Sequence, residues 1–338
     1  MKAYHLDRPG SIDGLVLRET PDPVVAGGDV LVRVGAASIN NRDLMVVNDQ
    51  YGFPIPAGLV PLSDAAGVVE AVGPDVRRLK VGDKVAPTFQ LDWVGGPPRP
   101  EYWGSDLGGS LPGVLATKLV LPESAFVRTP SHLSVEESAA LGCAGITAWA
   151  SLTTPSPVGA SDTVLVQGTG GVALFALQFA KAMGARVIAT TSSAEKARFL
   201  TSLGADTVID YVETPEWDAA AIAATGGQGV DLVVETGGPT TIGRSLSALR
   251  IGGRLALVGF SGGFGPSLDP LSLIGRAISI QTISVGSRTD FEDMNRLIET
   301  HGIRPVIDKV FPFDQAREAL EHLAQRRHRG KVVIGVSE

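Results

Sequence analysis

A ten-residue segment, Val164 to Ala173, constrains the fold of this chain more than any other. It reads Val-Leu-Val-Gln-Gly-Thr-Gly-Gly-Val-Ala, a β-forming run followed by a glycine turn and then by residues at helical spacing. Gly168 permits a tight turn, and Gly170 leaves room for a pyrophosphate to approach the backbone. Ala173 stands at the third position, which the looser G-x-G-x-x-A pattern allows. The segment therefore predicts an α/β fold with a dinucleotide site.

The start of the following helix supplies the phosphate-binding groups of this predicted site. We expect the exposed amides at its N-terminus, including those of Gly171 and Val172, to bind the phosphates. The alternative is a tight structural turn without a ligand. The strand before the turn and the helix after it favour the dinucleotide site.

The residues after the next predicted strand distinguish between the two nicotinamide dinucleotides. An NAD site usually carries Asp or Glu there, about 20 residues after the glycines, to bind the ribose 2′-OH. This chain has Thr190-Thr191-Ser192-Ser193, with Lys196 three residues further on; the nearest acid is Glu195, and its neighbours argue against a role at the ribose. Hydroxyl groups and an ammonium suit a 2′-phosphate, so the sequence favours NADP(H), bound by Ser192 and Lys196. Alternatively, Ser192 and Ser193 are helix caps and Lys196 is a solvated side chain.

The remaining sequence divides into a β-rich part and a part in which strands and helices alternate. The chain has 338 residues, of which 44% are hydrophobic, and this suits two domains with packed cores. The first 125 residues contain short β-forming runs that end at Gly, Pro and Asp, as in a small barrel or sandwich. From about residue 126 the alternation implies a parallel sheet with helices on both faces. We expect strands at 163–167, 186–190, 207–211, 231–235, 254–260, 278–285 and 331–336, and helices at 172–183, 194–203, 240–249, 291–300 and 313–326.

Charge and cysteine content argue against several classes of protein. The chain has 29 Lys and Arg against 36 Asp and Glu and a net charge of −7, so we expect no nucleic-acid and no membrane partner. The single cysteine, Cys143, excludes an intrachain disulfide and any metal site that needs two thiolates. The first residues lack the apolar core of a signal peptide, and no run of 18 apolar residues occurs. We therefore expect a soluble, cytoplasmic protein.

Several separated motifs resemble those of the medium-chain dehydrogenase/reductase superfamily. They are the glycine turn with the helix Leu174–Lys181, the segments Gly67–Gly73, Val81–Val85 and Leu203–Asp206, and the ending Gly330–Ile334. The resemblance implies a GroES-like, β-rich catalytic domain built from residues 1–125 and 288–338. A Rossmann NADP(H)-binding domain, a doubly wound parallel sheet, would span residues 126–287. The resemblance also implies an active site in the cleft between them, and a homodimer or homotetramer formed near Ile278–Val285.

The chain is most similar to the zinc-independent branch of the superfamily, which includes quinone oxidoreductases. In zinc alcohol dehydrogenases a Cys, a His in a Gly-His-Glu motif and a later Cys or Asp bind zinc. Here Asn40 stands at the first of these positions, Ser63 and Asp64 replace His-Glu, and Cys143 stands at the third. One plausible ligand of three cannot hold a catalytic zinc ion, so we expect no metal. Cys143 is then a small apolar residue of the cleft or, alternatively, a reactive thiol.

The same resemblance assigns further residues to the cofactor. Lys196 and Tyr211 would contact the 2′-phosphate; the alternative for Tyr211 is an aromatic side chain that packs on the sheet. The residues expected to flank or close over the nicotinamide are Gly259, Phe260, Gly286, Ser287 and Lys331.

Without zinc, the negative charge that hydride transfer creates needs another source of stabilisation. An enone, enal or quinone delocalises this charge itself, whereas a simple ketone needs hydrogen-bond donors from the protein. The candidate donors are Asn40, Tyr51, Ser63 and Thr147.

Two of these candidates have specific alternatives. Tyr51 follows Asn40 by eleven residues, and related 2-enoyl thioester reductases have a proton-donating Tyr at this spacing. A neutral phenol can protonate an enolate, although a structural Tyr beside Phe53 is also consistent with the sequence. Asn40 is a hydrogen-bond donor to substrate or nicotinamide, or else a turn residue. Asp43 and Asp64 either orient these donors or have structural roles. In the structural alternative, Asp43 is a helix cap or an ion-pair partner, and Asp64 is a strand cap.

Together these features favour an NADPH-dependent, zinc-independent oxidoreductase that transfers hydride to an activated C=C bond or a quinone. The small-molecule substrate would be a carbonyl, an enone or a quinone. One alternative is an alcohol dehydrogenase or carbonyl reductase that uses NADP without zinc. Another is a nucleotide-binding protein with little turnover.

Overall fold

The glycine turn lies at the end of a central strand in a parallel sheet. In the computed structural model, which describes residues 1–259 and 273–336, this sheet has six strands in the order β10-β9-β8-β11-β12-β13, all parallel. The strand order changes direction at β8, and ligands of such sheets bind at the carboxyl ends of strands at this point. The strands are β8 (Thr163–Gln167), β9 (Arg186–Thr191), β10 (Thr207–Asp210), β11 (Val230–Glu235), β12 (Leu249–Leu257) and β13 (Ser279–Thr282).

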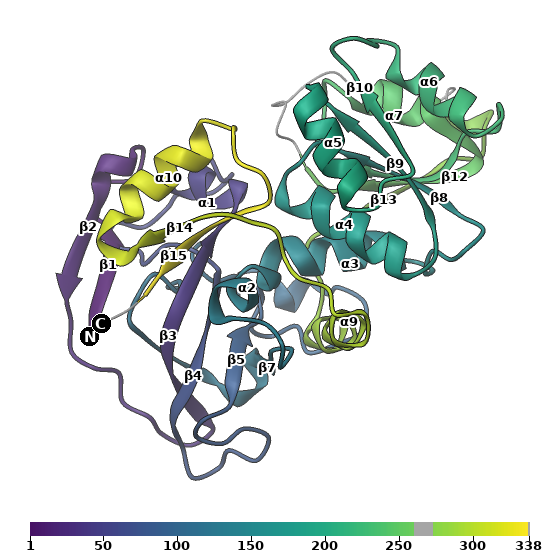
Figure 1. The fold of residues 1–338 in the computed structure, drawn as a ribbon. Helices are drawn as coiled ribbons and strands as arrows, with labels where there is room; N and C mark the ends of the chain where they lie inside the picture. The colour runs from purple at the N-terminus through teal and green to yellow at the C-terminus, as the bar shows by residue number, and fades with distance from the viewer. Residues whose placement is uncertain (260–272, 337–338) are drawn as a thin grey trace. The chain divides into compact units, whose positions relative to one another are not determined.

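Helices cover both faces of this sheet, as the alternating pattern predicts. Helices α4 and α5 lie on one face and α6 and α7 on the other (Figure 1). Helix α6 was not expected from the sequence; its Trp217 is 6% exposed and belongs to the core cluster beneath α6 and α7. The helices are α3 (Ile146–Thr153), α4 (Gly171–Ala182), α5 (Ala194–Ser202), α6 (Trp217–Ala224) and α7 (Ile242–Ala248).

A second sheet, mostly antiparallel, is built from both ends of the chain. Its order is β14-β15-β3-β4-β5-β7, with β6 also paired to β3, and only β14 and β15 are parallel. The C-terminal strand β15 thus lies between β14 and the N-terminal strand β3. The strands are β3 (Asp29–Ile39), β4 (Asp64–Val72), β5 (Lys84–Pro87), β6 (Lys118–Pro122), β7 (Phe126–Arg128), β14 (Ile307–Pro312) and β15 (Lys331–Gly335), and β1 (Lys2–Leu6) pairs with β2 (Leu15–Glu19).

Short helices complete this β-rich part and bury its apolar core. The core includes Leu6, Val32, Leu107 and Phe126, each at most 2% exposed. No helix in the described part of the chain is long and apolar enough to cross a membrane. The helices are α1 (Asn41–Val47), α2 (Val135–Ala139), a π-helix η4 (Leu141–Gly145), α9 (Arg288–His301), α10 (Ala316–Ala324), and four 3₁₀ turns, η1 (Ile12–Gly14), η2 (Pro100–Tyr102), η3 (Glu123–Ala125) and η5 (Phe313–Gln315).

The chain divides into two units whose limits differ from the expected ones. Unit 1 comprises Met1–Ile146 and Val285–Glu338, and unit 2 comprises Thr147–Ser284. The sequence places the breaks after residues 125 and 287. Residues 126–146 nevertheless lie in unit 1, because β7 pairs with β5 and α2 packs on β3 and β4. The alternation of strands and helices begins there, but α2 packs on the mostly antiparallel sheet of unit 1.

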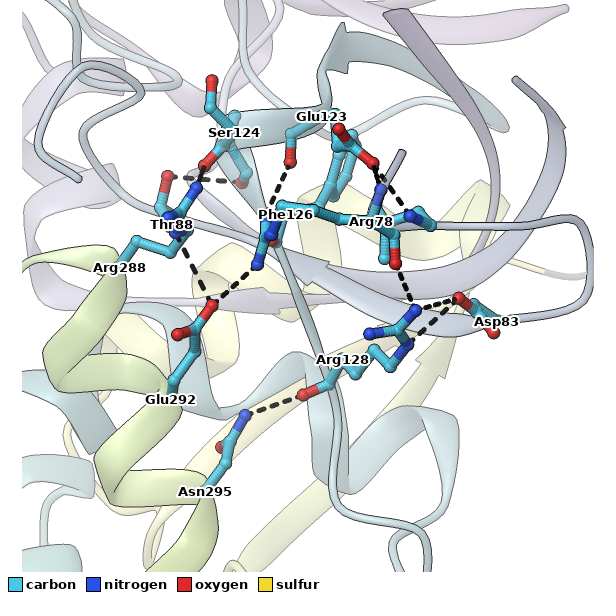
Figure 2. Close-up of polar contacts among 12 residues, drawn as sticks. Arg78, Asp83, Thr88, Glu123, Ser124, Phe126, Arg128, Arg288, Glu292 and Asn295 are labelled. Carbon is cyan, nitrogen blue, oxygen red and sulfur yellow. Dashed lines mark hydrogen bonds and ion pairs between the residues drawn. The ribbon is translucent and has the colours of Figure 1, made fainter. Parts of the chain in front are cut away.

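Polar contacts fix α9 within unit 1. Arg78 Nη2 donates to Glu292 Oε1 at 2.7 Å, and Asn295 Nδ2 donates to the carbonyl oxygen of Arg128 at 2.9 Å. Both contacts are drawn in Figure 2. Helix α9 thus accepts one hydrogen bond and donates another to segments near β7. These contacts attach α9, the first helix after unit 2, to unit 1.

Candidate active site

The register of three neighbouring strands brings the first group of candidate residues together. Val332 of β15 lies opposite Ile39 of β3, and Asp64 of β4 lies opposite Ser38. Asn40, the next residue after β3, therefore lies beside the first residues of both neighbouring strands, Lys331 and Asp64. Residues 40 and 331 are neighbours only because β15 returns to β3.

Asp64 links this group through both of its carboxylate oxygens. The Ser63 hydroxyl donates to Oδ1 at 2.8 Å, and the backbone N–H of Cys143 donates to Oδ2 at 3.0 Å. Lys331 Nζ lies 3.6 Å from Asp64 Oδ2 and donates a hydrogen bond to Asn40 Oδ1. Lys331 is 3% exposed and Asp64 is fully buried. We call Asn40, Ser63, Asp64, Cys143 and Lys331 the buried polar cluster.

Asn40 joins this cluster to the start of helix α1. Asn40 is the N-cap of α1, and its backbone N–H donates to Asp43 Oδ2 at 2.7 Å. Asp43 is thus the third residue of the helix and completes a capping box, and it is not itself the N-cap. The Asn40 side chain is 8% exposed, and its Nδ2 has no hydrogen-bond partner among the described residues. A buried amide N–H₂ without a partner is costly in a folded protein, and such groups often mark functional sites.

Arg42 connects α1 to the candidate proton donor and to the loop that follows β5. Its Nη2 donates to Asp106 Oδ2 at 2.7 Å, its Nη1 donates to Asp43 Oδ1 at 3.3 Å, and its guanidinium carbon lies 4.5 Å from the Tyr51 ring centroid. Burial raises the pKa of Asp43 to about 6; Arg42 opposes this rise and Asp64 adds to it. Burial also raises the pKa of Tyr51, against the effect of Arg42. Tyr51 is therefore a neutral phenol at pH 7.

The structure thus links Asn40 and Ser63 through Asp64 and Lys331, and it places Tyr51 next to Arg42. Thr147 belongs to unit 2, where its carbonyl oxygen accepts a hydrogen bond from Ser151 Oγ at 2.7 Å. The sequence offered Asp64 as a carboxylate that orients the donors, and the hydrogen bond from Ser63 agrees with that alternative, whereas it placed Lys331 at the cofactor. The pairing of residues 291 positions apart carries no local signal that could reveal this cluster.

In unit 2 the glycine turn has the backbone that a phosphate site requires. Gly168 has a φ of +77°, which favours glycine, and its N–H donates to the Thr190 carbonyl at 2.8 Å. A Cβ at Gly168 or Gly170 would meet no protein atom within 4 Å, so the turn is open on that side. Gly170 caps α4 without a side chain, and α4 begins at Gly171. The residues present therefore fit a dinucleotide pyrophosphate at a helix N-terminus.

A buried carboxylate that the sequence did not single out braces this turn. Glu235, at the end of β11, is fully buried, and its Oε1 accepts hydrogen bonds from the N–H groups of Gly237 and Gly238 at 2.8 Å each. Its Oε2 accepts from Gln167 Nε2 at 2.9 Å and from the Ser245 hydroxyl. Gln167 directly precedes the first glycine, so Glu235 ties the ends of β8 and β11 together.

The carboxyl end of β9 carries the residues expected at a 2′-phosphate. Ser193 Oγ accepts from the Lys196 N–H at 3.3 Å and caps α5, which confirms the capping alternative for Ser193. Ser192 is half-buried, and Lys196 Nζ has no ion-pair or hydrogen-bond partner within residues 1–259 and 273–336. Tyr211 is 44% exposed, so its ring does not pack fully on the sheet, and its N–H donates to the Thr191 carbonyl at 2.8 Å.

The remaining residues expected at the nicotinamide lie in different settings. A Cβ at Gly259 would lie 2.5 Å from the Thr236 carbonyl oxygen, so only glycine fits there. Phe260 lies outside the described residues. Gly286 and Ser287 lie in unit 1, where Ser287 caps α9: its Oγ accepts from the Asp290 N–H at 3.2 Å and donates to Asp290 Oδ2 at 2.5 Å.

Fold and site together define a nucleotide-binding protein with a separate β-rich unit that carries a buried polar cluster. The family described as "Alcohol dehydrogenase GroES-like domain" matches residues 26–131, and the family described as "Zinc-binding dehydrogenase" matches residues 171–300. Zinc-type alcohol dehydrogenase-like protein C1773.06c of Schizosaccharomyces pombe is 42% identical over 315 residues, 91% of each chain. Acryloyl-coenzyme A reductase of Sulfurisphaera tokodaii is 29% identical over 347 residues, covering 96% of this chain and 98% of the relative.

Solved structures agree with these matches. One from Sinorhizobium meliloti 1021, assigned as an alcohol dehydrogenase, shares 40% identity with a TM-score of 0.93 and covers 99% of this chain and 98% of that chain. Mycobacterial Rv1454c, solved in complex with NADPH, shares 29% identity with a TM-score of 0.83 and covers 99% of this chain and 100% of that chain. The chain belongs to the medium-chain dehydrogenase/reductase superfamily of oxidoreductases, with a GroES-like domain and a Rossmann domain. The fold class expected from the sequence is confirmed.

One family description and the fission-yeast relative's name imply zinc, so the donor set of the buried polar cluster has to be compared with that ion. A catalytic zinc ion needs three protein ligands. Burial and the Asp64 carboxylate raise the pKa of the Cys143 thiol, which disfavours the thiolate that zinc binds. The Lys331 ammonium contacts both Asn40 and Asp64, and no group of three or more His, Cys, Asp or Glu side chains suited to a metal occurs among the described residues. These residues do not fit a catalytic zinc ion.

Proposed function

We propose that this protein is an NADP(H)-dependent oxidoreductase that works without zinc and transfers hydride to an activated C=C bond or a quinone. The observation that carries this proposal is the buried polar cluster, which offers hydrogen-bond donors and an ammonium but no metal-ligand set. Conjugated substrates spread the developing charge over several atoms. They therefore need less stabilisation from the protein than a simple ketone does.

Unit 2 would hold the cofactor, which supplies the hydride when it is bound. The pyrophosphate would lie on the turn from Gly168 to Gly171, where the backbone is open. Ser192, Lys196 and Tyr211 would contact the 2′-phosphate, since residues 192–194 directly after β9 include no carboxylate and the Lys196 ammonium has no partner among the described residues. The NADPH complex of Rv1454c supports this choice of cofactor.

Unit 1 would supply the groups that act on the substrate. Asn40 would donate a hydrogen bond to the substrate oxygen, because its buried Nδ2 has no partner among the described residues. Tyr51 would deliver the proton that completes the reduction, since its raised pKa keeps the phenol protonated at neutral pH. Ser63, whose hydroxyl donates to Asp64, would support the cluster rather than contact the substrate.

The substrate would be a small molecule, and the protein would be a cytoplasmic homodimer or homotetramer without a nucleic-acid or membrane partner. The similarity to acryloyl-coenzyme A reductase favours reduction of a C=C bond conjugated to a carbonyl group. The similarity to alcohol dehydrogenases favours a second candidate, an NADP-dependent carbonyl reductase in which hydrogen bonds replace zinc.

Product analysis distinguishes these two functions. EDTA-treated protein is incubated with NADPH and one simple α,β-unsaturated ketone, and the product is identified by mass spectrometry and NMR. We expect the saturated ketone. An allylic alcohol would instead establish carbonyl reduction, and no NADPH consumption with enones, quinones or ketones would point to a nucleotide-binding protein with little turnover.

A further inference from the structure

The buried polar cluster places a lysine among the three positions that correspond to zinc ligands in other members of the superfamily. Lys331 Nζ contacts Asn40 and Asp64 directly, and Asp64 in turn accepts from the Cys143 N–H. The side chain thus occupies the region where a metal ion would have to bind. These residues do not fit a zinc ion, and in that region the chain itself supplies a buried cation, the ammonium of Lys331.

The sheet fixes this cation in place. Lys331 is the first residue of β15, and its N–H donates to the Val306 carbonyl at 2.9 Å. Gly330 has a φ of +78°, and a Cβ there would lie 2.2 Å from the same carbonyl oxygen. Only glycine therefore allows β15 to begin at residue 331. A buried ammonium needs a counter-charge, which Asp64 provides.

The ammonium determines the orientation of the Asn40 amide. A lysine ammonium donates hydrogen bonds and accepts none, so the amide oxygen of Asn40 has to face it. The Nδ2 group then points away from Lys331. It is buried and has no hydrogen-bond partner among the described residues.

We propose that Lys331 is a positioning residue that stands in the place of zinc, because it fixes Asn40 with Nδ2 as the donor to the substrate oxygen. This inference rests on the proposed function. The hydride, which the reduced nicotinamide would give up by breaking its own C–H bond and so become oxidised, forms a C–H bond at the β-carbon of the enone. The C=C electron pair moves toward the carbonyl carbon, and the carbonyl π pair moves to oxygen, which gives an enolate. The Asn40 N–H stabilises that oxygen, and a proton from Tyr51 or water adds to the α-carbon and completes the saturated ketone.

Three variants test this role separately from folding and cofactor binding. Lys331→Met removes the charge, Lys331→Arg keeps it, and Asn40→Leu keeps the approximate size of the side chain but removes the Nδ2 donor without adding a charge. We expect Lys331→Met and Asn40→Leu each to lower kcat by about 100-fold, the typical effect of losing one oxyanion donor, while the Kd for NADPH changes by less than about twofold. Lys331→Arg should keep kcat within about tenfold of the wild type. The matched control is Lys309→Met, an exposed lysine of the neighbouring strand β14.

The double variant provides the decisive comparison. Because both residues act through one donor, Lys331→Met combined with Asn40→Leu should be little slower than either single variant. Multiplied losses in the double variant would overturn the proposal, as would a kcat within about threefold of wild type in Lys331→Met. A rise in the Kd for NADPH that matches the fall in kcat would instead assign Lys331 to the cofactor.

Two further arms keep the test conclusive. If Lys331→Met does not fold because Asp64 is left without a counter-charge, the Lys331→Met/Asp64→Asn protein removes both charges, and the same loss of kcat is expected. If the wild type yields the allylic alcohol, the proposed function fails. The same variants then report on Lys331 through the rate of carbonyl reduction, and an unchanged rate would overturn the inference.

Discussion

Asp43 shows how burial changes the chemistry of a single side chain in this protein. Asp43 is fully buried next to Arg42 and close to the carboxylate of Asp64, and its pKa rises from 3.8 to about 6. The folded protein thus binds this proton more tightly than the unfolded chain. The resulting contribution to stability is present below about pH 4 and is lost as the pH rises to about 6.

Replacing Asp43 by Asn should remove this pH dependence. The difference in unfolding free energy between wild type and Asp43→Asn should fall by up to about 3 kcal/mol from pH 4 to pH 7, because each pKa unit corresponds to 1.36 kcal/mol. Urea unfolding at pH 4, 5, 6 and 7 measures it. Asp75→Asn, at an exposed site, controls for the loss of a surface carboxylate. A difference that stays constant with pH would show that Asp43 is charged throughout.

Lys196 is the residue on which the choice of cofactor depends most directly. Lys196→Ala should raise the Kd for NADPH by about tenfold or more and leave the Kd for NADH nearly unchanged, because only NADPH carries the 2′-phosphate. Titration of the intrinsic fluorescence with each cofactor measures both constants. Arg198→Ala, an exposed residue of the same helix, is the matched control. Equal losses for both cofactors would remove Lys196 from the phosphate site.

Tyr51 distinguishes proton donation from simple packing. Its ring packs edge-on against Phe53 at 5.4 Å between centroids, and both roles are compatible with that contact. Tyr51→Phe should lower kcat by about 10²-fold or more, the contribution of a general acid, with little change in the Kd for NADPH. Tyr102→Phe, in the loop stacked on Trp93, controls for the loss of a phenol elsewhere. Unchanged turnover would leave Tyr51 with a packing role.

Among the elements, the turn between β8 and α4 offers a substitution that affects the ligand and not the fold. Gly170 has a φ of −76°, and a Cβ there meets no protein atom within 4 Å. Gly170→Ala should therefore keep the melting temperature of the protein without cofactor and raise the Kd for NADPH by about tenfold or more, because the methyl group projects toward the pyrophosphate. Gly168→Ala, at φ +77°, should lower stability as well, by about 1 kcal/mol.

Thermal denaturation with and without NADPH separates these two effects. A Gly170→Ala protein that binds NADPH as tightly as wild type would make this turn a purely structural one.

Local sequence predicted the elements around the nucleotide turn closely. Strand β8 was expected at 163–167 and is found there, and α4 begins one residue before the expected position 172. Glycine turns and helical spacing are local signals, so these elements could be recognised. Helix α6 and strand β14 were missed, since one is a short alanine-rich segment and the other an edge strand that depends on β15.

At the scale of the whole molecule, both unit limits and the buried polar cluster depend on pairings that the sequence does not display. The first break lies at residue 146 and not at 125, because residues 126–146 pack on a sheet formed by residues far away. Asn40 and Ser63 were recognised as candidates from their positions. Their connection through Asp64 and Lys331 required the register between β3, β4 and β15.

Metal content is the property of the whole protein that best tests the zinc-free interpretation. Purified protein should contain less than about 0.1 zinc per chain and keep its turnover after EDTA treatment, since the described residues provide no set of three ligands. Inductively coupled plasma mass spectrometry measures the metal. About one tightly held zinc per chain, with activity lost on chelation and restored by zinc, would contradict this interpretation.

The position of β15 between β14 and β3 also determines the order in which the protein can mature on the ribosome. Translation releases Asn40 and Asp64 early, and all of unit 2 has to be synthesised before Lys331 emerges. Until then β3 is paired with β4 alone along its Ala36–Ile39 segment and lacks its second neighbour, and Asp64 lacks its counter-charge. Because N-terminal segments fold first during synthesis, the growing chain carries an unfinished sheet while the Rossmann domain forms. A chain that terminates before residue 331 therefore cannot assemble the buried polar cluster.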